Sequence, residues 1–387
     1  MKISNNTQNI RPSAIRKMFN KALQYVRVIS FTLGEPDFTA SDNVVRAGCE
    51  AIKKGYSKYT ANAGILELRQ AVSNNLFAKN NIFYNPQTEI TITVGAMDAL
   101  YLTLKVLLNP GDEVILSAPC WTNYAEQIKM CDGIPVLVQV TEDNDFRFDI
   151  DTLRAAITDK TKAILINSPC NPTGSMLDLR TLEGIADLAK EKDLLVISDE
   201  VYQYIVFDGN EHISISKIDG MKERTVIIDS WSKSYAMTGW RVGYAAGPEW
   251  LISNITKLQE NVVACAATPC QYAALEAITG PQDYVEYMVS RYKERRDIIV
   301  EKLNEIPGIS CKKPKGTFYA FANIKGTGLT SDEFAMKLLE EKQVVVVPGT
   351  AFTEFGEGYI RISFATSMEE IIKGMALIKE FVSGLKK

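Results

Sequence analysis

The stretch from Asp229 to Tyr244, DSWSKSYAMTGWRVGY, most restricts what this chain can fold into. It begins at the end of TVIID (residues 225–229), whose β-branched and apolar side chains predict a buried strand. Lys233 therefore falls just beyond a strand end, where open α/β sheets bind ligands. A desolvated lysine amine loses its proton readily and can form a Schiff base with a carbonyl compound. Three neighbours predict an anion site beside it, which sets it apart from an ordinary solvated loop lysine: Ser230, Ser232 and Arg241.

The composition limits the chemistry that this lysine can serve. His212 is the one histidine among 387 residues, which disfavours zinc hydrolases and Ser or Cys triads. The 43 basic and 47 acidic side chains nearly balance, and neither a GxGxxG nor a GxxxxGK string occurs. We therefore expect the partner to be a small molecule, rather than a metal, a nucleic acid or a membrane.

Cysteine usage and the N-terminal residues bear on where the protein works. The seven cysteines form no CxxC pair and are odd in number, which suits a reducing cytosol. The first residues, MKISNNTQNIRPSAIRKMF, contain no apolar core of signal-peptide length, and residues 12–26 have the spacing of an amphipathic helix. We expect a soluble cytoplasmic protein.

Other predicted strands also end in groups that suit a ligand. EITITVGAMDALYLTLKVLL predicts a strand, a glycine turn and a long helix. The backbone N–H groups of Gly95, Ala96 and Met97 would then favour an anion, although many such turns hold nothing. The strand LLVIS brings Asp199 to the same sheet edge as Lys233, which favours a ligand site over a helix cap.

Residues 230–243 resemble the lysine signature of class I pyridoxal-phosphate (PLP) aminotransferases, with Trp231 bulkier than the residue usual at its position. Four further strings resemble family segments in the family's order: LGEP, YTANAGILELR, SPCNPTG and GYIRISFA. The likeness runs from Gly34 to Arg361. It implies that PLP is the cofactor and that the enzyme is a transaminase.

The resemblance also implies a role for each residue around the cofactor. Lys233 would carry PLP as a Schiff base and then act as the base, and Asp199 would keep the pyridine nitrogen protonated. Tyr202 would bond the ring oxygen. The remaining cofactor contacts would come from Tyr59, Gly95, Ala96, Met97, Trp121, Asn171, Ser230, Ser232 and Arg241.

The substrate would be held by a second set of groups. The family likeness makes Arg361 the bidentate clamp for the substrate α-carboxylate, with the backbone of Gly34 and the amide of Asn171 beside it. Tyr59 matches a tyrosine that reaches the cofactor phosphate of the neighbouring subunit. A homodimer with shared active sites is therefore expected.

The choice of amino acid depends on a departure from the family. Met97 stands where one aspartate-preferring subgroup has a lysine, and a thioether suits apolar or aromatic side chains. Three aromatic residues are expected to add apolar walls: Phe318, Tyr319 and Phe352. We expect a broad enzyme that favours neutral or aromatic donors over aspartate, with a 2-oxo acid such as 2-oxoglutarate as acceptor. The alternatives are a carbon–sulfur β-lyase on the same scaffold and a catalytically silent regulator.

The expected architecture is α/β, because predicted strands and helices alternate. The resemblance makes it a fold-type-I PLP-dependent transferase, with a mainly parallel-sheet large domain and a smaller α+β domain from both chain ends. Residues 45–290 would form the large domain, residues 291–387 the small domain, and residues 1–44 an arm and part of the small domain. A strand is expected to end at Gly34, and the resemblance implies cis peptide bonds before Pro119 and Pro172.

Overall fold

The computed structural model describes residues 3–4, 7–8, 10, 18, 20–25 and 27–385. The amphipathic helix expected over residues 12–26 falls mostly outside these residues. The other expected elements are found within a residue or two of their predicted bounds, with one exception near Gly34.

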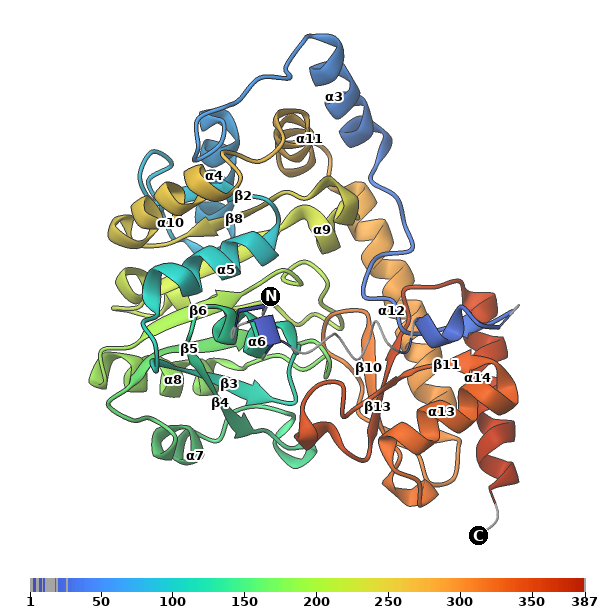
Figure 1. Ribbon diagram of the computed structural model, residues 1–387. Helices are drawn as coiled ribbons and strands as arrows, with labels where there is room; N and C mark the ends of the chain where they lie inside the picture. Colours follow the sequence, from blue (N-terminus) through green and yellow to red (C-terminus); the bar gives the residue numbers. More distant parts are fainter. Residues whose placement is uncertain are drawn as a thin grey trace.

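A seven-stranded sheet forms the centre of the larger part of the molecule, drawn at the left of Figure 1. Its order is β2-β8-β7-β6-β5-β3-β4, and β3 to β7 all run parallel to one another. Strand β8 runs antiparallel to both its neighbours, so the sheet is mixed but mainly parallel, as expected. The bounds are β2 Ile90–Thr93, β3 Glu113–Ala118, β4 Ile134–Gln139, β5 Thr161–Asn167, β6 Leu195–Asp199, β7 Thr225–Ser230 and β8 Gly243–Ala246.

Both faces of this sheet are covered by helices, which explains why its central strands are almost continuously apolar. Alternate residues of each strand enter different cores: Ile164 and Val196 pack with α7 and α8, while Leu165 and Ile197 pack with α5, α6 and α10. The helices of this part are α3 Asp42–Lys53, α4 Leu66–Asn80, α5 Ala96–Leu107, α6 Asn123–Met130, α7 Ile150–Ala155, α8 Leu179–Glu191, α9 Trp231–Ser234, α10 Glu249–Val262 and α11 Thr268–Thr279.

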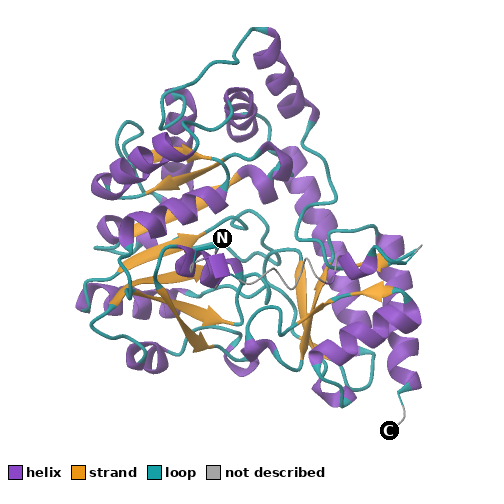
Figure 2. Ribbon diagram, viewed as in Figure 1, coloured by secondary structure: helices purple, strands orange, loops and turns teal. Residues whose placement is uncertain are grey.

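The smaller domain lies beside the larger part and contains a four-stranded antiparallel sheet, seen at the right of Figure 2. Residues near the start of the chain join it, because β1 pairs in parallel with β11. The domain is therefore built from both chain ends. Its strands are β1 Ile29–Ser30, β9 Ser310–Cys311, β10 Tyr319–Asn323, β11 Val344–Val345, β12 Val347–Pro348 and β13 Tyr359–Ser363, and its helices are α13 Ser331–Lys342 and α14 Met368–Gly384.

Helix α12, Asp283–Asn304, runs between the two parts (Figure 1). We propose domain boundaries near residues 44 and 290. Because α12 continues through residue 290 without a break, the second boundary falls inside this helix, which would act as a continuous link between the domains.

The strand expected to end at Gly34 is shorter than predicted. Strand β1 stops at Ser30, and Gly34 lies four residues further on in an extended segment without regular structure. The carbonyl of Thr32 accepts a hydrogen bond from the Arg361 side chain at 2.8 Å, so a side chain takes the place of a neighbouring strand. Within VISFTL only Phe31 and Thr32 are buried, and Leu33 is exposed.

Three further features of the fold bear on the expectations. The peptide bonds before Pro119 and Pro172 are cis, as is the bond before Pro169. His212 is buried against Glu200, with Nε2 3.0 Å from a carboxylate oxygen, and it does not line the cavity described below. No helix in the described part of the chain combines the length and the apolar character needed to cross a bilayer.

Candidate active site

The carboxyl ends of β5, β6 and β7 meet at one edge of the large sheet. Asn167, the last residue of β5, pairs with Asp199, the last residue of β6. Strand β7 ends at Ser230 and leads directly into the short helix α9, which carries Lys233. Side chains that are far apart in sequence therefore meet at this edge, as parallel strands require.

A cavity of about 540 Å³ opens at this edge, within the range usual for small-molecule sites. It lies where the large domain faces the four-stranded sheet of the smaller one. The residues predicted for the site that line it are Gly34, Ala96, Met97, Trp121, Asn171, Asp199, Tyr202, Ser230, Ser232, Lys233, Arg241 and Arg361.

Lys233 is held at the first turn after β7. The Ser230 hydroxyl caps α9 by accepting a hydrogen bond from the backbone of Ser232 at 3.4 Å. The Lys233 amine donates to the carbonyl of Gly34, which brings the two predicted residues together. Burial lowers the pKa of Lys233 to about 8, and the nearby cations Arg361 and Arg241 act in the same direction, whereas Glu35 opposes them. A larger fraction of neutral amine is available than for a solvated lysine.

Asp199 is buried at the inner end of the cavity. Its Oδ2 accepts a hydrogen bond from the Tyr124 hydroxyl at 2.7 Å, and its Oδ1 accepts one from the backbone N–H of Val201 at 3.2 Å. Burial raises the pKa of Asp199 to about 6, although the Tyr124 hydrogen bond favours the carboxylate. A carboxylate that is buried away from water is stabilised by a cationic partner, so Asp199 is positioned to pair with a cationic group of a ligand.

Arg361 enters the cavity from the smaller domain. It lies on β13 and is almost fully buried, with Nη1 donating to Asn171 Oδ1 at 3.0 Å. Its guanidinium group stacks on the rings of Tyr319 and Phe352, at 4.3 and 4.8 Å from their centroids. These contacts fix the plane of the guanidinium group, as bidentate binding of a carboxylate requires.

The Asn171 side chain is oriented by the same contact. Since its oxygen accepts from Arg361, its NH₂ group is the end that can donate to a ligand. Tyr202 lies nearby, and its hydroxyl is 3.1 Å from the hydroxyl of Tyr319. Trp121 packs edge-to-face on Tyr124, with ring centroids 5.3 Å apart, and lines the cavity with its own ring.

The N-terminus of α5 forms an anion cradle. Gly95 has φ of 78°, and a Cβ atom there would lie 2.5 Å from Arg241 Nη2. Only glycine therefore allows the guanidinium group to approach the first turn of the helix. The helix N-terminus and Arg241 bring positive charge to one end of the cavity, beside the hydroxyls of Ser230 and Ser232.

Four of the residues predicted for the site or its walls do not line this cavity. Gly95 contributes through the cradle behind it, whereas Tyr59 is 86% exposed on the surface of the chain. Phe318 and Phe352 were expected as cavity walls, but both are fully buried behind the lining. Phe352 packs on Arg361 and Phe318 packs on Tyr202, so they support lining residues instead of facing a ligand. Tyr319 does line the cavity, as expected.

Several lining residues were missed from the sequence. Tyr124 is the most informative, because it follows Trp121 by three residues at the start of α6, which places both on one side of a helical turn. Asn123 precedes it, and its amide contacts the Met97 sulfur at 3.8 Å. The others lie within three residues of predicted positions: Thr32, Leu33, Glu35, Leu100, Val201 and Thr238.

The residues present fit PLP at each of its functional groups. The cradle of α5 and Arg241 suits a phosphate, and the buried Asp199 suits a protonated pyridine nitrogen. Trp121 provides an aromatic face, Asn171 and Tyr202 provide donors for a ring oxygen, and Lys233 provides an amine for the aldehyde.

Comparison with known proteins identifies the class. Residues 26–377 match the family model for aminotransferase class I and II, so the chain belongs to that family, which generally uses PLP. The chain is 44% identical to an aspartate aminotransferase of Pyrococcus abyssi and 42% identical to aromatic-amino-acid aminotransferase 2 of Thermococcus litoralis. Each alignment covers 97% of this chain and 97% of the relative. It superposes on the aspartate aminotransferase of Thermus thermophilus with a TM-score of 0.94, at 35% identity and covering 98% of this chain and 99% of that one.

The protein is accordingly an aminotransferase of the aspartate and aromatic group, and it acts on amino acids. This agrees with the transaminase expected from the lysine signature, and it disfavours both the β-lyase and the silent regulator. The two named relatives differ in substrate although their identity to this chain is nearly equal, so overall identity does not decide which amino acid is preferred.

Proposed function

We propose that this chain binds PLP in the cavity above Lys233 and moves an amino group between an L-amino acid and a 2-oxo acid. The observation that carries the proposal is the meeting of Lys233, Asp199, Asn171 and Arg361 around one cavity. When bound, PLP supplies the electron sink that stabilises negative charge at the substrate Cα. The protein supplies binding, orientation and proton transfer.

Each residue has a defined task in this proposal. Arg361 binds the α-carboxylate of the amino acid, and Asn171 keeps the guanidinium group in plane. The Lys233 amine takes the proton from the substrate Cα, which its depressed pKa of about 8 allows near neutral pH. Asp199 keeps its charge opposite the ring nitrogen, while Tyr124 holds that carboxylate in place.

The products distinguish transamination from β-elimination. Purified protein supplied with PLP, an amino donor and 2-oxoglutarate is expected to form one oxo acid for each glutamate. Turnover should stop when the 2-oxo acid is omitted, because the amino group then has no acceptor. Release of pyruvate and ammonia without an acceptor would instead support a lyase.

Substrate choice is proposed to favour neutral or aromatic donors over aspartate. Met97 lines the cavity. The three cations that line the same cavity, Lys233, Arg241 and Arg361, are already assigned to the cofactor aldehyde, the phosphate and the α-carboxylate. A distal carboxylate therefore finds no spare cation among the described lining residues of this chain. Leu33 and Leu100 add apolar surface to the same lining.

We expect kcat/KM for phenylalanine to exceed that for aspartate at least tenfold with one common acceptor, a difference of about 1.4 kcal/mol in transition-state binding. Met97→Lys should move the ratio toward aspartate by supplying a cation, and Met97→Leu should leave it nearly unchanged. A tenfold preference of the parent enzyme for aspartate would overturn this assignment.

We propose that the enzyme is a homodimer whose active sites are shared. Tyr59 lies on an exposed loop of its own chain, close in sequence to the exposed side chains of Tyr56 and Leu66. Such a surface suits a subunit interface, and a tyrosine there can reach the anion cradle of a second copy. Each site would then need residues from two chains.

Mixing two defective variants tests this arrangement. In a heterodimer of Tyr59→Ala and Lys233→Ala, one site has both intact residues and the other has neither. Random exchange of equal amounts should therefore restore about a quarter of parental activity, because half the dimers are mixed and each has one good site. If mixing restores nothing, Tyr59 does not act across the interface.

A cytoplasmic location is also proposed. All seven cysteines are free thiols, which suits a reducing compartment.

A further inference from the structure

The segment of residues 31–41, called here the crossing segment, links the smaller domain to α3, and its residues 32–35 line the cavity. In Figure 1 it is the blue stretch that descends beside α12. Among the described residues, those from 32 to 40 make no backbone-to-backbone hydrogen bond. Their position therefore depends on side chains.

One end of the crossing segment contacts the site. The Thr32 carbonyl accepts from Arg361 at 2.8 Å, the Gly34 carbonyl accepts from Lys233, and Glu35 accepts from the Thr238 hydroxyl at 3.1 Å. A Cβ atom at Gly34 would lie 2.9 Å from the Tyr319 hydroxyl, so the backbone is close to the lining. A small shift of this end would change the space between Lys233 and Arg361.

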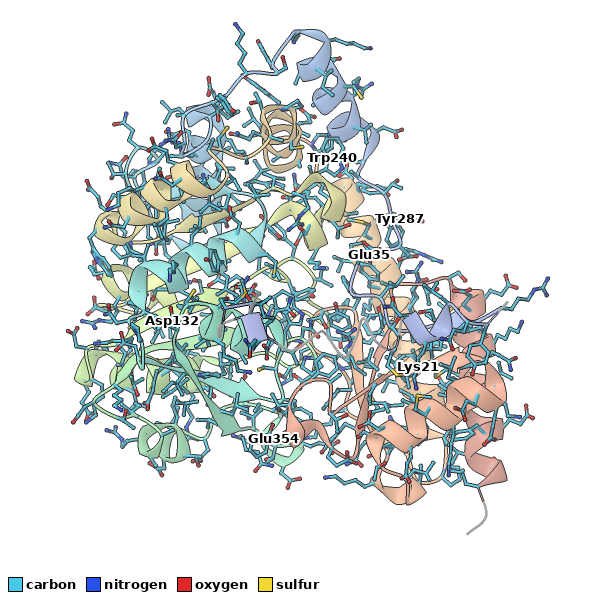
Figure 3. The ribbon with its side chains drawn as sticks, in the orientation of Figure 1. Lys21, Glu35, Asp132, Trp240, Tyr287 and Glu354 are labelled. Atoms are coloured by element: carbon cyan, nitrogen blue, oxygen red, sulfur yellow. The ribbon has the colours of Figure 1, made fainter. Side chains whose placement is uncertain are left out.

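The other end is held by α12. Asp37 Oδ1 accepts a hydrogen bond from Arg295 Nη1 at 2.8 Å, and the Arg295 side chain is only 9% exposed. The Arg295 guanidinium group lies 5.1 Å from the centre of the Phe38 ring. Figure 3 labels Glu35 on the crossing segment and Tyr287 on α12 at this junction.

An aromatic cluster completes this attachment. Phe38 packs edge-to-face on Tyr292, Tyr287 and Tyr284, with centroids 5.4, 6.0 and 6.5 Å away. The Tyr284 hydroxyl also donates to the Thr39 carbonyl at 3.0 Å. Pro36, with its fixed φ, lies between the site contacts and the helix contacts and restricts the backbone that joins them.

We propose that the Asp37–Arg295 ion pair positions the substrate. It fixes the crossing segment on α12 and thereby sets where Gly34 lies relative to Lys233 and Arg361. Asp37 and Arg295 do not line the cavity, so they act through the segment and touch neither substrate nor cofactor. The inference rests on the proposed function, since it assumes that an amino acid binds between Lys233 and Arg361.

The test is Asp37→Asn, which keeps the shape of the side chain and removes its charge. We expect KM for phenylalanine to rise about tenfold while kcat changes less than threefold, because a buried arginine loses its charged partner. Binding of 3-phenylpropanoate, an analogue of phenylalanine that lacks the amino group and so reports binding without chemistry, should weaken by a similar factor. The visible absorption of the bound cofactor should not change.

Matched variants separate positioning from general damage. Glu294→Gln removes a charge from the same helix, where it pairs with Arg291 at 2.6 Å on the exposed side, and should leave KM within twofold. Arg295→Gln should resemble Asp37→Asn, and the double variant should be no worse than either single one. Asp37→Glu keeps the charge and should recover part of the substrate binding. If Asp37→Asn does not fold, the same measurements are made on Asp37→Glu.

The outcomes distinguish this inference from the proposed function. A parent enzyme without cofactor absorption or transamination would overturn both. If the parent is active but Asp37→Asn binds 3-phenylpropanoate as tightly as the parent, only the positioning role is wrong. Equal loss of cofactor and substrate binding would also contradict it, because the pair would then be purely structural.

Discussion

Replacing Lys233 with alanine is expected to lower kcat by about 10⁴-fold, the upper end of what general acid–base catalysis supplies. The physical reason is the loss of the amine that takes the proton from the substrate Cα. No other lysine of the described chain lines the cavity to replace it. Steady-state rates with phenylalanine and 2-oxoglutarate measure the effect. Lys233→Arg should be as impaired as Lys233→Ala, although it keeps the positive charge. Residual activity above about 1% of the parent enzyme in either variant would contradict the assignment.

The pH dependence of cofactor loading provides a second view of Lys233. Only the neutral amine reacts with an aldehyde, and burial lowers the pKa of Lys233 to about 8. The rate at which cofactor-free protein combines with PLP is therefore expected to rise with pH up to about 8 and to level off above it. A rate still rising through pH 10 would indicate an ordinary solvated lysine.

Asp199→Asn is expected to lower kcat by about 100- to 1,000-fold, the loss typical for removing one preorganised electrostatic partner. The neutral amide cannot keep the ring nitrogen protonated, while the size of the side chain is unchanged. The residues proposed to hold the phosphate lie on other elements, so cofactor binding should fall much less than kcat. Rates and equilibrium binding of PLP measure the two effects separately.

Tyr124→Phe is the graded control for that prediction. It keeps the carboxylate and removes one hydrogen bond to it, which should cost about tenfold in kcat or less. If Asp199→Asn turned over substrate within a few-fold of the parent enzyme, Asp199 would serve only as a structural cap.

Much of the site could be predicted because its chemistry-bearing residues follow strand ends directly. Lys233, Asp199 and Asn171 come within four residues of the ends of β7, β6 and β5, and parallel strands deliver their ends to one edge. Arg361 lies on a strand of the smaller domain, and its place in the site was predicted only from the family likeness.

What could not be predicted depends on contacts between distant segments. Tyr124 reaches Asp199 across 75 residues of sequence, and Thr32 reaches Arg361 across 329, so neither contact has a local signal. Phe318 and Tyr319 are adjacent, and only the structure shows that the tyrosine faces the cavity. Sequence alternation indicates that neighbours point apart, but not which of them meets the ligand.

The central claim is that Lys233 is the residue bonded to the cofactor. Borohydride reduction of the protein loaded with PLP, followed by peptide mapping, tests it most directly, because reduction makes the bond permanent. The account predicts one modified peptide, spanning the α9 segment, with the added mass on Lys233. A modification on any other lysine, with Lys233 unmodified, would contradict it.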